Sequence, residues 1–172
     1  MTEETVSQFG AVVIGGLIAI MSGFVTTVLE DRQRQARLPR NLAMAFKGEI
    51  AALVDRARER RYADRISEVI AQIEATNEPF FMPLRIRFAY DRVFDNNVEQ
   101  IGILGGPLPE LIPRFYTGLT LVLYDMANLA DGTYKGLPIP VLLRVYRDAQ
   151  RVLGETLAVG ERVIEEIDVR YR

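Results

Sequence analysis

The chain has 172 residues, of which 21 are basic and 23 acidic, and this near balance excludes the basic excess that a nucleic-acid-binding surface requires. It contains no Cys, His or Trp, which excludes disulfides, zinc sites with nitrogen or sulfur ligands, thiol nucleophiles and imidazole catalysis. Its length suits an anchor and one modest domain, for which we predict no cofactor and no enzymatic activity.

The first predicted element is a transmembrane helix over residues 9–29. These 21 residues carry no charge and follow a short tail, residues 1–8, that contains Glu3 and Glu4. At ~1.5 Å per residue, a helix of this length covers the ~30 Å hydrocarbon core of a bilayer. A secretory signal peptide would instead have a basic start and a shorter apolar run. A buried core helix is the other alternative, but apolar runs of this length seldom belong to water-soluble domains.

The charges that flank the predicted span give it a direction. Residues 1–8 contain no Lys or Arg, whereas the juxtamembrane segment, residues 30–40, contains Arg32, Arg34, Arg37 and Arg40. Because basic residues stay on the cytoplasmic side, we expect the N-terminus to lie outside and the body, residues 41–172, in the cytoplasm.

Small residues recur at every fourth position of the predicted span. They are Ser7, Ala11, Gly15, Ala19, Gly23 and Thr27. Such a ridge lets two helix backbones approach closely in lipid, although small residues are common in spans for other reasons. Since four residues turn ~400°, the ridge drifts about 40° per step and cannot face one straight partner along its whole length. We predict packing against other transmembrane helices, either of the same chain or of a larger complex.

Two amphipathic helical segments follow the break at Pro39. Apolar residues at helical spacing include Leu42, Phe46 and Ile50. The same period resumes after the Arg60–Arg61 pair, so we expect either a second helix or a kinked continuation that ends near Asn77.

A proline-containing crossover loop is predicted over residues 78–86, because Pro79 and Pro83 each remove a backbone donor. For the Phe80–Phe81 pair inside it, we favour lining the core over contact with a partner or a membrane. A short helix over residues 88–101 is expected next, ending at Gly102, and residues 105–109 form a turn by composition.

Two longer helices complete the predicted body, over residues 108–130 and 141–169. Pro113 is compatible with the first of them only within its first turn, and Asp131–Gly132 should end it. Glycines at 154 and 160 weaken the second helix by up to about 1 kcal/mol each. No segment alternates with period two, so the predicted fold is all-α, an antiparallel helical bundle behind one transmembrane helix.

The most reactive-looking group is a carboxylate stripe, Asp91, Asp95 and Glu99, at i, i+4 and i+8 of the short helix. Oxygen ligands of this kind can hold a divalent cation. Solvation or pairing with nearby arginines is the favoured interpretation, because the chain has no His to complete a metal cluster. The glycines at 102, 105 and 106 lack the Lys-Ser/Thr sequence of a phosphate-binding loop and are interpreted as turn residues.

The stretch YDRVFDNNVEQIGILGGPLPELIPRFY, residues 90–116, resembles a broad set of uncharacterised bacterial single-span membrane proteins. Those proteins share an F-D-x-N-x-x-x-I-G-x-L motif followed by R-F-Y. The matching positions are Phe94, Asp95, Asn97, Ile101, Gly102, Leu104, Arg114, Phe115 and Tyr116. The resemblance implies a recurrent structural element, with Gly102 as a helix C-cap, Asp95 or Asn97 bonding the loop backbone, and Arg114 pairing with that loop.

Taken together, these features favour a non-enzymatic scaffold or accessory subunit of a membrane assembly, anchored in a bacterial inner membrane. An effector or sensor that acts on the membrane, as in defence or lysis, is a second hypothesis. A carboxylate-dependent hydrolase is the third. The expected partners are the lipid bilayer and other transmembrane helices, and nucleic acid is not expected.

Overall fold

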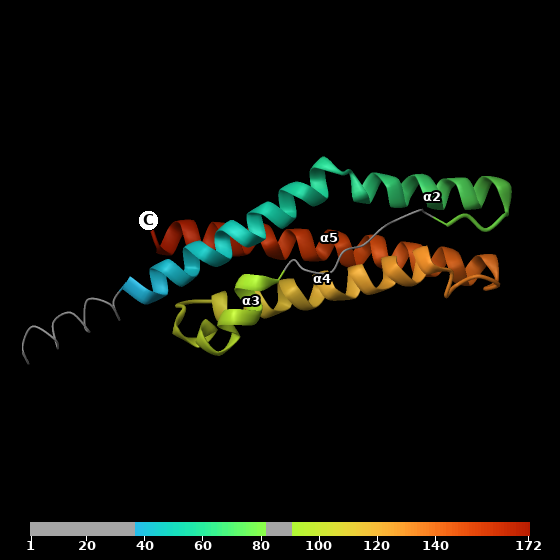
Figure 1. Ribbon diagram of the computed structural model, residues 1–172. Coiled ribbons are helices and arrows are strands. Elements are labelled where there is room, and N and C mark those ends of the chain that lie inside the picture. The colour runs from blue at the N-terminus through green and yellow to red at the C-terminus, as the bar shows by residue number, and fades with distance from the viewer. Residues whose placement is uncertain (1–36, 82–90) are drawn as a thin grey trace, which may run out of the picture. The chain divides into compact units, whose positions relative to one another are not determined.

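The computed structural model describes residues 37–81 and 91–172, and every regular element within these ranges is a helix. The chain divides between Asn41 and Leu42, and the second unit, Leu42–Arg172, is a helical bundle (Figure 1). The all-α prediction is therefore confirmed for the described residues. The predicted transmembrane helix and its small-residue ridge, Ala11, Gly15, Ala19, Gly23 and Thr27, lie outside them. Among the described helices, none combines the length and the apolarity needed to cross a membrane.

The chain bends at the Arg60–Arg61 pair, as the sequence predicted. The described residues 37–59 are helical, with residues 42–59 in the second unit, and α2, Tyr62–Thr76, follows after Arg61 adopts a left-handed backbone with φ 51°. The helix α2 ends at Asn77, which is also left-handed and whose N–H donates to the carbonyl of Ile73. Asn tolerates this conformation better than most residues, which explains why the helix stops there. Of the two alternatives, the structure shows a second helix rather than a kinked continuation, and the predicted end near Asn77 is confirmed.

Polar pairs show how these two segments run along the longest described helix, α5 (Ile139–Arg170). In successive pairs, the residue number rises along residues 42–76 and falls along α5. The pairs are Lys47 with Asp168, Arg58 with Glu161, Ser67 with Gln150, and Glu74 with Arg147. Residues 42–59 and α2 therefore lie antiparallel to α5.

In the described part of the crossover loop, the side chains of Phe80 and Phe81 have different environments. Phe81 packs against the bundle core, as expected, whereas the side chain of Phe80 remains 37% exposed. After the loop, α3 spans only Arg92–Asn97, and a 3-10 helix, η1, continues over Val98–Ile103. The prediction of one short regular helix is thus wrong from Val98 onward, because the backbone tightens from α to 3-10 geometry there.

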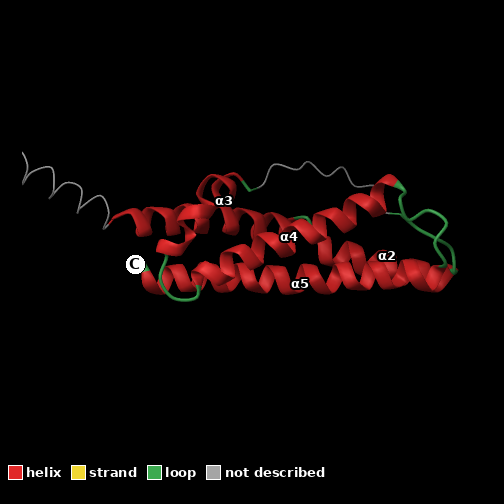
Figure 2. Cartoon of the chain, turned by 90° about the horizontal axis from the view of Figure 1, so that it is seen from below, coloured by secondary structure: helices red, strands yellow, loops and turns green. Residues whose placement is uncertain are grey.

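The helices α4, Leu108–Asp131, and α5 are joined by a short turn and lie side by side (Figure 2). Gly132 ends α4 with φ 88°, as predicted. Pro113 is the sixth residue of α4, so the expectation that it falls in the first turn is wrong. Its missing N–H leaves the carbonyl of Pro109 without the usual helical donor, a loss that the helix accepts near its start.

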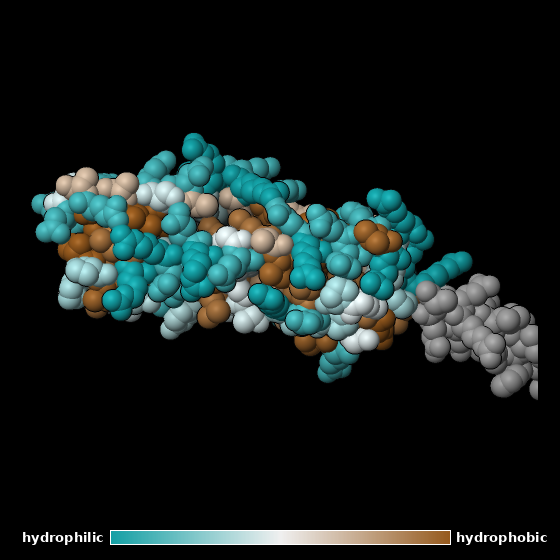
Figure 3. Space-filling view, turned by 180° about the vertical axis from the view of Figure 1, so that it is seen from behind, coloured by the Kyte–Doolittle hydropathy of each residue, from teal (hydrophilic) through white to brown (hydrophobic). Residues whose placement is uncertain are grey.

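The core of the bundle consists of two apolar clusters. The first cluster contains Leu42, Ala43, Phe46, Ile50, Val54, Ile101, Leu104, Leu108, Leu111, Ile112, Phe115, Tyr116, Val163 and Ile167. The second cluster contains Ile66, Val69, Ile73, Val122, Met126, Leu129, Leu142, Tyr146, Ala149 and Leu153. On the face that Figure 3 shows, hydrophilic side chains predominate, with separate hydrophobic areas between them. The long helices α4 and α5 contribute to both clusters and so connect the two halves of the body.

Candidate functional site

The motif residue Tyr116 lies at the centre of an aromatic group in the first cluster. Its side chain is only 4% exposed. The ring of Phe94 stacks on it at 4.4 Å between centroids with an interplanar angle of 24°. Phe115 and Phe46 approach it edge-on at 5.2 and 6.5 Å. Contacts of this kind fix the ring orientation, so the position of the hydroxyl is set by three different elements.

The carboxylate of Glu49, on the helix over residues 42–59, accepts two hydrogen bonds from different elements. Its Oε2 accepts from the hydroxyl of Tyr116 on α4, and its Oε1 accepts from the backbone N–H of Val93 at 2.9 Å. The helix α3 has no side-chain cap of its own at Asp91. Glu49 therefore caps α3 from another helix, which satisfies one of the amide donors at its start. We call Glu49, Val93, Phe94 and Tyr116 the Glu49 network.

The electrostatic environment keeps the hydroxyl of Tyr116 protonated. Burial raises its pKa above the ordinary value, the hydrogen bond to Glu49 raises it further, and the negative charges of Glu49, Asp91 and Asp95 act in the same direction. Both burial and nearby anions disfavour the phenolate. Tyr116 is therefore a fixed hydrogen-bond donor and cannot serve as a general base near neutral pH.

Sequence reasoning missed Glu49, although a signal was present. Glu49 follows the buried Phe46 by three positions and precedes the buried Ile50, so it borders the apolar face of its helix. A carboxylate at such a position needs a buried partner or a route to water. That partner, Tyr116, is 67 residues away in the chain, and the spacing within one helix could not identify it.

The predicted contacts of Asp95 and Asn97 with a loop are not those observed. Asn97 donates through Nδ2 to the carbonyl of Val93 at 2.7 Å, four residues back in the same helix. Asp95 is exposed, and its backbone N–H donates to the carbonyl of Asp91 within the first turn of α3. Both residues thus stabilise α3 locally, because a six-residue helix has few backbone bonds of its own.

The carboxylate stripe does not persist as predicted. Asp91 precedes α3 as its N-cap residue, Asp95 lies within α3, and Glu99 belongs to η1, where the helical period changes from 3.6 to 3.0 residues. Within residues 37–81 and 91–172, no group of three carboxylate, imidazole or thiol side chains could hold a metal ion. The alternative of a carboxylate-dependent metal site therefore has no geometric basis in the described body.

Gly102 is not a helix C-cap, which corrects the assignment that the resemblance implied. It lies inside η1, and the left-handed glycine of the following turn is Gly106, with φ 64°. The side chain of Arg170 lies over Gly106, where a built Cβ would meet its Nη2 at 2.1 Å. The N–H of Gly105 donates to the hydroxyl of Tyr171 at 3.1 Å. The end of α5, rather than a helix cap, thus holds this turn.

Arg114 is exposed, in contrast to its predicted pairing with the same loop. In the described part of the chain, no hydrogen bond or ion pair joins its guanidinium to residues 102–107. The polar contact of this loop comes instead from the hydroxyl of Tyr171, directly after α5, and the side chain of Arg170 lies over Gly106. The sequence motif therefore contains one buried network residue, Tyr116, and several residues with local or no polar contacts.

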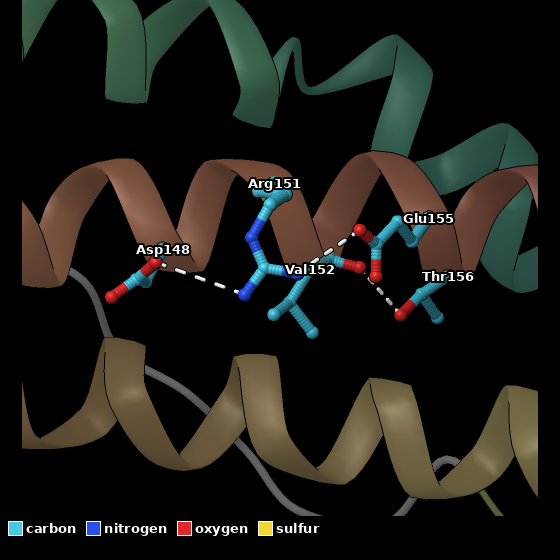
Figure 4. Close-up of polar contacts among 5 residues, drawn as sticks. All are labelled: Asp148, Arg151, Val152, Glu155 and Thr156. Atoms are coloured by element: carbon cyan, nitrogen blue, oxygen red, sulfur yellow. Dashed lines mark hydrogen bonds and ion pairs between the residues drawn. The ribbon is translucent and has the colours of Figure 1, made fainter.

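Glycines on α4 and α5 let three helices approach closely beside this network. A Cβ at Gly160 would lie 2.7 Å from Cε2 of Phe115 and 2.9 Å from Cγ2 of Val54. A Cβ at Gly118 would lie 2.3 Å from the Oγ1 of Thr156, which donates to the carbonyl of Val152 at 2.7 Å (Figure 4). Gly154, by contrast, has nothing within 4 Å of its built Cβ. Of the two glycines that were predicted to weaken α5, Gly160 therefore allows close helix packing, whereas Gly154 does not contribute to it.

A polar hollow lies between the end of α2 and the first turns of α5. Its floor is apolar, with Ile73 and Leu143, and its rim carries Arg144 together with the Arg147–Glu74 ion pair. Both members of that pair are more than 45% exposed, so water screens their attraction and the pair contributes little to the stability of the fold.

No protein-family model, curated protein or solved structure matches the chain. The resemblance to bacterial single-span proteins stays a prediction from the quoted motif.

Proposed function

We propose that this protein is a non-enzymatic, single-pass membrane-anchored scaffold or accessory subunit of a membrane protein assembly. The observation that supports it is the uncharged run over residues 9–29, twelve residues before the helical unit Leu42–Arg172. A run of this length and composition is typical of a transmembrane helix. A compact bundle behind one anchor suits presentation of a binding surface at the membrane.

The chemistry of the described body also favours a structural role. The polar contact between Glu49 and the buried Tyr116, together with the bond from Val93, joins three elements and keeps the Glu49 carboxylate and the Tyr116 hydroxyl engaged. A hydroxyl that stays protonated and donates that proton to an internal carboxylate can neither act as a general base nor donate the same proton to a substrate. This supports the scaffold over the carboxylate-dependent hydrolase.

We place the protein in a bacterial inner membrane with its N-terminus outside and the bundle in the cytoplasm. The four arginines within residues 30–40 and the absence of basic residues before the run support this direction. The partners would be other transmembrane helices, contacted through Ala11, Gly15, Ala19, Gly23 and Thr27.

The test measures the native mass of the full chain extracted in mild detergent, with co-purifying subunits identified. Gly15→Leu and Gly23→Leu should each reduce the mass of the assembly, because leucine separates the helix backbones. Gly16→Leu is the matched control, since it makes the same change beside the ridge, and it should leave the mass unchanged. An assembly of equal mass in all variants would contradict the scaffold proposal. Growth arrest on overexpression that disappears without residues 9–29 would instead favour the membrane-acting effector.

A further inference from the structure

One end of the bundle gathers exposed apolar side chains from three separate segments. Met44, Val98, Ile103 and Val169 are 46%, 49%, 43% and 78% exposed. Met44 lies on the helix over residues 42–59, and Val169 lies on the last turn of α5. Val98 and Ile103 both lie on η1. Single exposed hydrophobic residues are ordinary, but four at one end of a small bundle give that end several apolar side chains that can contact something apolar.

Contacts between these segments show that the four residues belong to the same end. Lys47, one turn after Met44, pairs with Asp168, the neighbour of Val169, at 2.5 Å. Leu42, Ile101 and Ile167 are all buried in the first cluster. The start of the unit, α3 with η1, and the C-terminus accordingly meet at one end in Figure 1. We call Met44, Val98, Ile103 and Val169 the apolar end.

The connection to the predicted span limits how far this end can lie from a bilayer. Twelve residues, 30–41, separate the last residue of the span from Leu42. They reach about 18 Å as a helix throughout and, because residues 37–41 are already helical, at most about 33 Å if residues 30–36 are extended. The opposite end of the bundle, with Phe80 and Val141, lies further away by roughly the ~36 Å length of a 24-residue helix such as α4. The apolar end is therefore the part of the bundle that the tether brings to the membrane.

The charges at this end are compatible with a lipid surface. Arg92 and Arg172 are exposed and form no ion pair within the described residues, so their side chains are available to lipid phosphates. Glu99 lies in the same 3-10 helix as Val98, so the end is mixed in charge. Apolar contact, rather than net charge, is the main attraction.

We propose that the apolar end of the bundle rests in the headgroup region of the bilayer that holds the anchor. This inference depends on the proposed membrane anchoring and adds which surface of the body faces the lipid. The side chains of Val98, Ile103 and Val169 then sit about 5–10 Å into the headgroup and acyl boundary, the depth that interfacial apolar groups reach. The opposite end, with Val141, points away from the membrane.

The chain's composition makes a direct test simple, because it contains no Trp. Single-tryptophan variants of the full chain are reconstituted in vesicles of phosphatidylethanolamine and phosphatidylglycerol, with and without brominated acyl chains as quencher. Phe24→Trp reports on the anchor and Val98→Trp on the apolar end. Val141→Trp is the matched control, a second exposed valine at the opposite end of the bundle. Val169→Trp repeats the measurement at the most exposed position, where tryptophan disturbs packing least.

Brominated lipid should quench the tryptophan at position 24 strongly and those at positions 98 and 169 by about twofold, as suits interfacial depth. It should leave position 141 unchanged. If position 24 is quenched but 98 and 169 are not, the inference fails while the anchor stands. An unquenched but blue-shifted tryptophan at 98 or 169 would show cover by protein and would overturn the lipid contact. If position 24 itself is not quenched, the proposed function fails and the inference fails with it.

Discussion

The first cluster draws side chains from four segments, the helix over residues 42–59, η1, α4 and α5, whereas the second draws them mainly from α2, α4 and α5. In the first, polar bonds between distant segments accompany the apolar packing. Glu49 joins three segments, and the hydroxyl of Tyr171 accepts from the turn after η1. In the second, long helices pack through apolar faces, and Tyr146 donates to the carbonyl of Phe80 at 3.1 Å.

The difference follows from the length of the elements. A long helix buries a continuous apolar stripe and needs few specific bonds to stay in place. The helix α3 has six residues, none of them fully buried, so apolar area alone cannot hold it against the bundle. It depends on one stacked ring and on a carboxylate from another helix. Short elements in this fold are therefore sensitive to single polar substitutions, and long ones to changes of volume.

The largest effect is expected for Glu49→Ala. The substitution leaves the hydroxyl of Tyr116 and the N–H of Val93 without their acceptor, and each such loss costs about 1–3 kcal/mol. We expect the free energy of unfolding of the full chain to fall by about 3 kcal/mol, measured by chemical denaturation with circular dichroism. Glu59→Ala, on the exposed face of the same helix, should change it by less than about 0.5 kcal/mol. Equal losses of unfolding free energy in both variants would show that the hydrogen bonds of Glu49 do not stabilise the first cluster.

A smaller loss is expected for Gly160→Ala, which adds a methyl group against Phe115 and Val54. Overpacking of this kind costs about 1–3 kcal/mol. Gly154→Ala makes the same change on the same helix in open space, and the better helix propensity of alanine should raise stability by up to about 1 kcal/mol. Opposite signs in thermal unfolding are the expected outcome. A gain in both variants would show that the close approach of the three helices is not required.

In the second cluster, Tyr146→Phe should cost about 1 kcal/mol, because the ring remains in place and the hydrogen bond to the carbonyl of Phe80 is lost. The same denaturation measurement compares it directly with Glu49→Ala. A loss as large as that of Glu49→Ala would mean that polar bonds matter equally in both halves.

The smallest effect is a dependence on alkaline pH. Because the folded-state pKa of Tyr116 is raised, folding keeps a proton that the unfolded chain releases above about pH 10. The stability that this group contributes is fully present below that pH and is lost as pH rises beyond it. Tyr116→Phe should therefore flatten the decline of unfolding free energy between neutral and strongly alkaline pH. An unchanged slope would show that Tyr116 ionises normally in the folded chain.

Residue spacing predicted the long elements and failed at the short ones. The periodic apolar residues of α4 and α5 and the stop at Asp131–Gly132 were read correctly, because each depends on neighbours three or four positions away. The expected helix over residues 88–101 has too few apolar positions to specify its geometry, and its change to a 3-10 helix at Val98 was not foreseen. The roles given to Gly102, Asn97 and Arg114 were wrong for the same reason, since their neighbours come from elsewhere in the chain.

What the sequence by itself determined is the all-helical body, the bend at Arg60–Arg61 and the end of α2 at Asn77, since these follow from local period and backbone preference. Only the tertiary structure decided that Glu49 reaches both α3 and Tyr116, and that Gly160 is required while Gly154 is not. Such contacts depend on which helices pack together and at what distance. No pattern within one helix contains that information, because the partners lie tens of residues apart.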